Sequence, residues 1–232
     1  MPALSVYRSE LKYIMSYADA AQLKIKLDAF LRTDEHAEDG SYRVKSLYYD
    51  TPCSRDFRDK INGLRTRQKL RLRIYSEEQP TAKLELKSKE GNYQHKISLE
   101  VSKDDARILA NGIYTPLFQY RSEDAMRLYA MLTVDGYRPA VIVEYDRTAY
   151  SYPAFDVRLT FDSRVRSSEM NLNLYDTNLP WNPIFTDAVI LEVKFNQNLP
   201  GFVQKILRPY RLTQTSFSKY CTGRPFAGSF IY

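Results

Sequence analysis

Cysteine and histidine are scarce in this chain, and their scarcity argues against several kinds of site. The 232 residues include 2 cysteines, Cys53 and Cys221, which are too few for a disulfide framework and lack metal-ligand spacing. The 2 histidines, His36 and His95, have no cysteine paired with them, and we interpret both as surface residues. Ser-His-Asp catalysis therefore has no support, and a reducing compartment is the simplest interpretation.

Long apolar runs are also missing. No stretch approaches the roughly 20 apolar residues of a membrane span, and the N-terminal MPALSVYRSE lacks the apolar region of a secretory signal. No linker rich in proline, glycine or serine, no internal repeat and no low-complexity tract divides the chain. We therefore expect a soluble cytoplasmic protein that folds as one α+β domain.

The composition is that of a globular protein with a basic bias. Hydrophobic residues make up 44% and aromatic residues 13% of the sequence, enough for a sizeable core. Lys and Arg number 34 against 28 Asp and Glu, a net charge of +6. This charge favours polyanionic partners, but it does not choose among nucleic acid, membrane headgroups and phosphate compounds.

Alternation of charged and apolar residues is the dominant pattern, and it predicts strands. The expected strands lie near residues 4–14, 42–50, 65–75, 81–89, 93–101, 139–151, 155–163 and 187–197. Serine caps predict helices after Ser16, Ser102 and Ser122, and a fourth helix is expected from Pro200 to Pro209.

The polar faces of these strands are mainly basic. Side chains two apart share a face, as in the sets Arg67, Lys69, Arg71, Arg73 and Lys83, Glu85, Lys87, Lys89. For a single strand, a face turned to water is the better explanation. Repetition on neighbouring strands weakens that explanation, because like charges across a strand pair are destabilising. Groups of opposite charge must therefore neutralise these Lys and Arg side chains.

About eight strands can close into a barrel. If the aliphatic face turns outward beneath the helices, the charged face lines a central tunnel. Arg and Lys there would bind a chain of phosphates, and the carboxylates could hold a bridging divalent cation. The expected fold is therefore a closed antiparallel β-barrel with a charged tunnel, flanked by helices.

Two alternatives remain open from the residues alone. The run from Arg65 to Arg73 could be a nucleic-acid patch, but interleaved Glu residues disfavour it, and no nucleic-acid partner is expected. Glu85 and Glu100 could be ion-pair partners for the Lys residues instead of metal ligands, because buried charges are normally paired.

An ordered set of motifs resembles a known family. The motifs are R-x-E-x-K-Y at Arg8–Tyr13, S-x-Y-Y-D-T at Ser46–Thr51, K-x-R-x-R-x-Y at Lys69–Tyr75, E-x-K-x-K at Glu85–Lys89, E-Y-x-R at Glu144–Arg147, R-x-T-x-D at Arg158–Asp162, L-E-V-K at Leu191–Lys194 and S-x-S-K-Y at Ser216–Tyr220. Together they resemble the VTC (vacuolar transporter chaperone) polyphosphate polymerase domain of the triphosphate tunnel metalloenzymes. The resemblance spans nearly the whole chain.

This resemblance implies a single tunnel domain over residues 1–232 that transfers the γ-phosphate of ATP onto a growing inorganic polyphosphate chain. It implies Mn²⁺ or Mg²⁺ as the cofactor, with Glu192 and Glu10 as metal ligands. The implied catalytic residues are Arg71, Arg73, Lys87, Arg147, Arg158 and Lys219, and the implied substrate-binding residues are Lys12, Lys69, Lys89, Lys96 and Lys194.

The chain departs from the family in two respects. The superfamily motif E-x-E-x-K appears as Arg8-Ser-Glu10-Leu-Lys12, which removes one carboxylate and disfavours two-metal hydrolysis. The SPX domain and transmembrane helices of the eukaryotic polymerase subunits are not in this sequence, which leaves room for a membrane partner that the chain does not encode. The alternatives are a tunnel triphosphate phosphohydrolase and a non-catalytic module that binds polyphosphate or nucleic acid.

Overall fold

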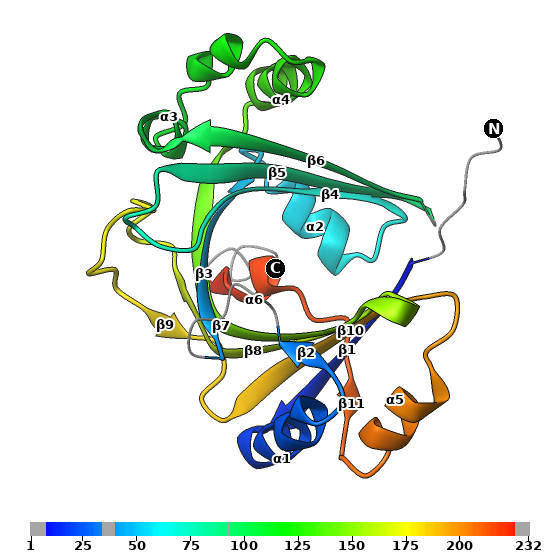
Figure 1. Cartoon of the computed structure of the whole chain (residues 1–232). Helices are drawn as coiled ribbons and strands as arrows, with labels where there is room; N and C mark the ends of the chain where they lie inside the picture. Colours follow the sequence, from blue (N-terminus) through cyan, green and yellow to red (C-terminus); the bar gives the residue numbers. More distant parts are fainter. Residues whose placement is uncertain (1–7, 34–39, 92, 226–232) are drawn as a thin grey trace, which may run out of the picture. The chain divides into compact units, whose positions relative to one another are not determined.

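Antiparallel strands and several helices give the protein a mixed α+β fold (Figure 1). The computed structural model describes residues 8–33, 40–91 and 93–225. The strands are β1 (Arg8–Ser16), β2 (Arg32–Thr33), β3 (Tyr42–Asp50), β4 (Thr66–Ile74), β5 (Thr81–Glu90), β6 (Tyr93–Ser102), β7 (Arg138–Tyr152), β8 (Val157–Ser168), β9 (Asn182–Pro183), β10 (Ala188–Asn196) and β11 (Thr213–Gln214). The α-helices are α1 (Tyr17–Asp28), α2 (Arg55–Ile61), α3 (Lys103–Ala110), α4 (Glu123–Val134), α5 (Gly201–Leu207) and α6 (Lys219–Thr222).

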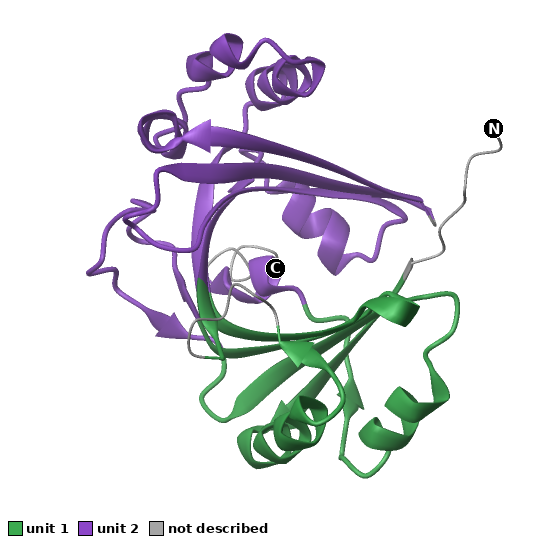
Figure 2. Ribbon diagram, viewed as in Figure 1, with its two compact units in different colours: residues 1–43, 145–165, 185–217 green, residues 44–144, 166–184, 218–232 purple. Residues whose placement is uncertain are grey.

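The chain divides into two compact units (Figure 2). The first unit comprises residues 1–43, 145–165 and 185–217, and the second comprises residues 44–144, 166–184 and 218–232. Neither unit is one continuous segment, because β7 and β8 run from one unit into the other. The expectation of a single domain over residues 1–232 stays a prediction.

The strand order corrects one expectation. In the first unit the order is β11-β1-β10-β8-β7, and in the second it is β7-β3-β4-β5-β6. The order therefore has two ends, β11 and β6, and the sheet of the described residues is not closed. The prediction of a closed barrel is wrong, while the antiparallel sheet and its flanking helices are confirmed.

The strands at the two ends of the order, β11 and β6, are poorly suited to pair with a further strand. β11 has 2 residues and pairs with β1 at Tyr13 and Ile14, so it is too short to support a further strand. β6 presents the exposed polar side chains Gln94, His95 and Lys96, which suit an unpaired edge. His95 is exposed as expected, although it lies in a strand, and His36 lies outside the described residues. The central tunnel stays a prediction.

The first unit has a core between its sheet and α1 and α5. Ser16 accepts a hydrogen bond from the Asp19 amide at 3.1 Å and so caps α1, as the sequence predicted. Leu23 and Leu27 are fully buried and belong to one cluster with Leu159, Leu191 and Val203. Each charged strand of this unit therefore has its apolar face against helices.

The second unit has its own core. Leu70, Leu72, Leu84 and Leu86 of β4 and β5 are buried together with apolar residues of α3 and α4, including Leu109 and Leu128. Ser102 and Ser122 cap these helices with their side-chain oxygens, as predicted. The sequence did not predict α2 and α6, which have 7 and 4 residues and lie beside each other.

The helices differ from membrane spans. None of those in the described part of the chain combines the length and the apolarity that a crossing of the bilayer requires.

Burial on α1 gives a stability prediction. Leu23 is 0% exposed, whereas Ile25 on the same helix is 71% exposed. We expect Leu23→Ala to lower the free energy of unfolding by about 2–5 kcal/mol, since it leaves a cavity in the first core. Ile25→Ala is the matched control and should change it by less than about 0.5 kcal/mol. Urea denaturation of both variants tests this, and equal losses would contradict the packing described here.

Candidate functional site

The first charged group surrounds Glu85 in the second unit, and we call Arg71, Arg73, Glu85 and Lys96 the Glu85 cluster. Glu85 is 2% exposed. Its Oε2 lies 2.8 Å from Arg71 Nη2 and 3.2 Å from Arg73 Nη2, and its Oε1 lies 2.6 Å from Lys96 Nζ. Burial alone would raise the pKa of Glu85, but Arg71 and Lys96 outweigh burial and lower it. Glu85 is therefore an ion-pair partner, as one of the sequence alternatives held.

Two tyrosines orient the arginines of this cluster. Arg71 Nη1 donates to the Tyr48 hydroxyl at 3.3 Å, and Arg73 Nη1 donates to the Tyr75 hydroxyl at 3.4 Å. The Arg73 residue is 9% exposed, and the Arg71 side chain is 12% exposed. This end of the charged face is therefore mostly buried, unlike the wet face of an ordinary antiparallel sheet.

Basic side chains also meet across three strands. Lys69 of β4, Lys87 of β5 and Lys96 of β6 occupy directly opposed positions. The next rows are Arg71, Glu85, Ser98 and Arg73, Lys83, Glu100. Basic residues outnumber carboxylates in these rows, and opposed like charges destabilise a sheet. A bound polyanion would relieve that repulsion.

The second charged group belongs to the first unit, and we call Glu10, Lys12, Arg147, Asp162, Glu192 and Lys194 the Glu192 cluster. Cross-strand register places Lys12 opposite Glu192 and Glu10 opposite Lys194. Lys12 Nζ lies 3.0 Å from Glu10 Oε1 and 3.4 Å from Glu192 Oε1. One ammonium group therefore lies within reach of two carboxylates.

Arg147 anchors this cluster from β7. Its Nε and Nη2 each donate to a different oxygen of Asp162 at 2.7 Å, and Asp162 is 0% exposed. Such a two-point pair fixes the plane of the guanidinium. Burial alone would lower the pKa of Arg147, but Tyr145 and Asp162 outweigh burial and raise it. Arg147 Nη2 lies 4.0 Å from Glu192 Oε2, so this fixed charge borders the carboxylate pair.

Burial and neighbouring charges act against each other at Glu10 and Lys194. Burial raises the pKa of Glu10, yet Lys12 and Lys194 outweigh burial and lower it, so the carboxylate stays ionised. Burial is also the main cause that lowers the pKa of Lys194, while Glu192 and Glu10 partly offset it. The two carboxylates therefore favour positive charge on Lys194, but burial outweighs them.

A divalent cation held by Glu10 and Glu192 stays a prediction. Within residues 8–33, 40–91 and 93–225, no group of three or more His, Cys, Asp or Glu side chains could hold a metal ion. Mg²⁺ is, however, usually bound by one or two carboxylates together with phosphate oxygens of a substrate. Glu10 and Glu192 match that pattern, and Lys12 already places a positive charge near both.

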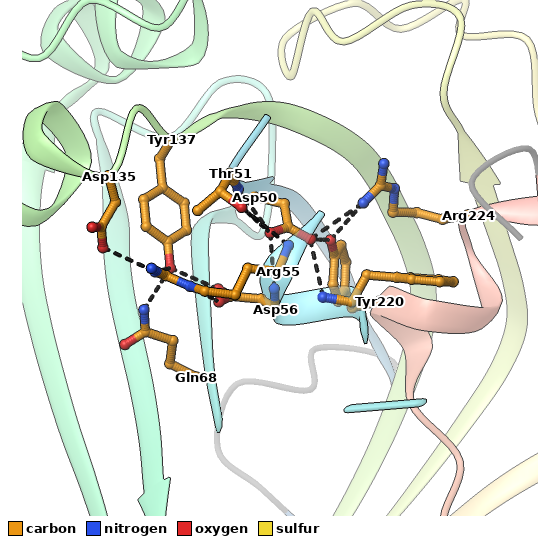
Figure 3. Close-up of polar contacts among 10 residues, drawn as sticks. Asp50, Thr51, Arg55, Asp56, Gln68, Asp135, Tyr137, Tyr220 and Arg224 are labelled. Carbon is orange, nitrogen blue, oxygen red and sulfur yellow. Dashed lines mark hydrogen bonds and ion pairs between the residues drawn. The ribbon is translucent and has the colours of Figure 1, made fainter. Parts of the chain in front are cut away.

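A buried polar network in the second unit was not predicted, and we call it the Asp50 network (Figure 3). The Asp50 carboxylate accepts hydrogen bonds from the amides of Thr51, Asp56 and Phe57 and from the Tyr220 hydroxyl. A separate branch joins Asp56 to Tyr137, Arg55, Gln68 and Asp135. Asp50 and Tyr220 stand in the motifs S-x-Y-Y-D-T and S-x-S-K-Y, but neither motif indicated that the two residues pair.

The structure divides the predicted site residues between the two units. The second unit contains Lys69, Arg71, Arg73, Lys87, Lys89, Lys96 and Lys219, and the first contains Glu10, Lys12, Arg147, Arg158, Glu192 and Lys194. Lys69 donates to the Ser218 hydroxyl at 2.8 Å, next to Lys219, and Lys89 lies opposite Arg67. Arg158 lies opposite Lys194 and donates to the Tyr42 hydroxyl at 3.4 Å. Their roles toward a substrate stay predictions.

Comparison with known proteins gives a family and a fold. The model of the VTC domain family matches residues 7–227. The crystal structure of a protein from Bacillus halodurans described as a "putative adenylate cyclase" matches with a TM-score of 0.54 and 14% identity, over 97% of this chain and 100% of that chain. A Pyrococcus horikoshii protein gives a TM-score of 0.42 and 15% identity, covering 87% of this chain and 86% of that one. No curated protein sequence matches significantly.

The environment of Asp56 predicts a pH effect on stability. Burial raises the pKa of Asp56 to about 7, and Tyr137 and Arg55 only partly offset it. An unfolded Asp has a pKa of about 3.9, so between about pH 4 and 7 the folded state binds the proton more tightly. The free energy of unfolding should therefore fall as pH rises through this window, by about 1.4 kcal/mol per unit of pKa difference.

Asp56→Asn cannot ionise, and it should abolish most of this slope in urea denaturation at a series of pH values. Asp104→Asn is the control, because the Asp104 side chain is 89% exposed on α3, and it should keep the wild-type slope. A variant at position 56 that kept the wild-type slope would show that Asp56 is ionised in the folded state.

Proposed function

Since this chain belongs to the VTC-domain family, we propose that it is a metal-dependent polyphosphate polymerase that transfers the γ-phosphoryl group of ATP onto inorganic polyphosphate. In this reaction the bond between the γ-phosphorus and its bridging oxygen breaks, and ADP leaves. A terminal oxygen of the acceptor chain forms the new bond to phosphorus. The proposal goes beyond family membership in naming the acceptor and the direction of the reaction.

One observation carries the proposal: the cross-strand rows of Lys and Arg on β4, β5 and β6. The row of Lys69, Lys87 and Lys96 repeats positive charge at the spacing of adjacent strands. A linear chain of phosphates repeats negative charge along its length, and Arg and Lys bind phosphate through charge-assisted hydrogen bonds. A small neutral substrate would bring no negative charge to these rows.

The arginines would act by orientation and charge. Glu85, Tyr48 and Tyr75 hold the guanidinium groups of Arg71 and Arg73 before any substrate arrives. Phosphoryl transfer requires positioning and charge stabilisation more than covalent help from the protein. Donors that are fixed in advance do not have to reorganise as charge develops in the transition state.

The chemistry needs no general base from the chain. The attacking oxygen of a polyphosphate end is already ionised at neutral pH, so no proton has to be removed. Glu10 and Glu192 would hold Mn²⁺ or Mg²⁺, which would offset charge on the reacting phosphoryl group when bound. Arg147, held by Asp162, would keep a permanent positive charge beside Glu192.

Incubation with ATP and Mn²⁺ tests the reaction class directly. We expect long-chain polyphosphate on a sizing gel, together with one ADP for each phosphate incorporated. Release of orthophosphate alone would instead assign a triphosphate phosphohydrolase. Tight polyphosphate binding without turnover would indicate a non-catalytic binding module.

Glu192→Gln tests the metal assignment. The Glu192 residue is 7% exposed, and Gln preserves its shape while removing its charge. We expect a folded variant that still binds polyphosphate through its Lys and Arg residues but loses Mn²⁺-dependent turnover by orders of magnitude. Melting temperature, polyphosphate affinity and initial rate are to be measured on the same preparation.

Glu100→Gln is the matched control, because Glu100 is an exposed carboxylate on β6, and it should keep its turnover. If Glu192 serves only as an ion-pair partner of Lys12, Arg147 and Lys194, its replacement should lower the melting temperature and leave turnover near the wild-type rate. That result would remove Glu192 from the metal site.

A further inference from the structure

Asp50 takes the place of the missing cap of α2. The residue before this helix, Ser54, has φ 53° and makes no side-chain cap. The Asp50 carboxylate instead accepts from the amides of Asp56 and Phe57, each at 3.0 Å. A carboxylate there satisfies the free amides and complements the positive end of the helix. Asp50 is 2% exposed, and these contacts with α2 are sufficient to explain why its carboxylate is buried.

Asp50 also contacts the C-terminal segment of the chain (Figure 3). The Tyr220 hydroxyl donates to Asp50 Oδ2, and Arg224 Nη1 lies 3.3 Å from the same oxygen. Arg224 Nη1 also donates to the Tyr220 hydroxyl at 2.8 Å. Burial and the Asp50 carboxylate raise the pKa of Tyr220, so the hydroxyl stays a donor.

Helix α6, which carries Tyr220, cannot hold its own position. It has 4 residues, far fewer than the roughly 12 that an isolated helix needs for stability in water. Its location therefore depends on tertiary contacts. The Tyr220 ring lies 5.3 Å from the ring of Tyr48 and 6.3 Å from that of Phe57. The next turn also fits closely, because a Cβ on Gly223 would lie 2.9 Å from Val143 Cγ2.

Fixing Tyr220 fixes the direction of its neighbour Lys219. Successive residues of a helix point in different directions, so Lys219 cannot share the site of Tyr220 against Asp50. The Lys219 residue is 9% exposed, and it directly follows Ser218, the N-cap of α6, whose hydroxyl accepts from Lys69. Tyr48, whose ring lies against that of Tyr220 in a tilted arrangement, also accepts from Arg71. Through these contacts Asp50 is connected to three of the predicted phosphate ligands, namely Lys219, Lys69 and Arg71.

We infer that Asp50 is a positioning residue, which holds α6 through Tyr220 and Arg224 so that Lys219 is placed to bind phosphate. The inference rests on the proposed function, in which Lys219 is a phosphate ligand. It assigns a role in substrate binding to a carboxylate and a tyrosine that themselves touch no phosphate. A purely structural role would instead stabilise the second unit without affecting affinity.

Tyr220→Phe tests the inference, and Tyr137→Phe is its matched control. Each variant removes one buried hydroxyl that donates to an Asp of the same unit, but Tyr137 contacts Asp56 and not α6. Both variants should lower the melting temperature. Only Tyr220→Phe should weaken tripolyphosphate binding in calorimetry, by roughly tenfold, the size of coupling between residues in contact.

Lys219→Ala completes a double-mutant cycle. If Tyr220 acts by placing Lys219, the change Tyr220→Phe should have little further effect on affinity once Lys219 is gone. Arg224→Met removes the second side-chain donor to Asp50 and should behave like Tyr220→Phe. Hydrogen exchange at the amides of Thr222 and Gly223 should become faster in both variants and remain unchanged in Tyr137→Phe.

Equal losses of affinity in Tyr220→Phe and Tyr137→Phe would overturn the inference, as would additive losses in the cycle. Wild-type affinity in Lys219→Ala would overturn it too, because Lys219 would then not bind phosphate. A wild-type protein without affinity for tripolyphosphate would refute the proposed function instead. In that case the exchange measurements would still decide whether Asp50 holds α6.

Discussion

A buried ionised side chain needs a partner, and this requirement organises the charged faces of the sheet. Glu85 is nearly inaccessible and is surrounded by Arg71, Arg73 and Lys96. Asp162 is fully buried and holds Arg147 by two hydrogen bonds. In each unit the carboxylate therefore fixes basic groups in place, at the cost of partly neutralising them. What remains after this pairing is an excess of positive charge on strands β4 to β6.

The same requirement distinguishes the acidic residues by role. Glu85 and Asp162 have short contacts with strongly basic groups and serve to orient them. Glu10 and Glu192 both lie near the ammonium of Lys12, at 3.0 and 3.4 Å, and near that of Lys194, at 3.9 Å. Asp50 receives donors from two helices and connects the turn after β3 to the C-terminal segment. Similar carboxylates thus orient arginines, pair with lysines or accept from the amides of a helix, according to their neighbours.

Closure of the sheet depends on more than the alternation of charged and apolar residues. About eight alternating strands are compatible with a barrel, but closure requires hydrogen bonds between the first and last strands of the order. Here β11 has 2 residues, and β6 carries exposed polar side chains on its edge. Each unit instead buries its apolar face beneath helices, α1 and α5 in one and α3 and α4 in the other. Packing helices on the apolar face buries it without closing the sheet. Both arrangements produce the same alternation of charged and apolar residues in the sequence.

The sequence by itself determined the eight longer strands but not the two-residue strands β2, β9 and β11, because a period of two assigns side chains to faces only where the chain stays extended. It also predicted the helices capped by Ser16, Ser102 and Ser122, since these caps involve residues three apart. Only the tertiary structure decided which charges meet. The pairing of Arg71 with Glu85 requires a register between strands, and that of Asp50 with Tyr220 joins residues 170 positions apart. Helices α2 and α6 were not predicted, because such short helices depend on contacts with distant segments and not on a local sequence pattern.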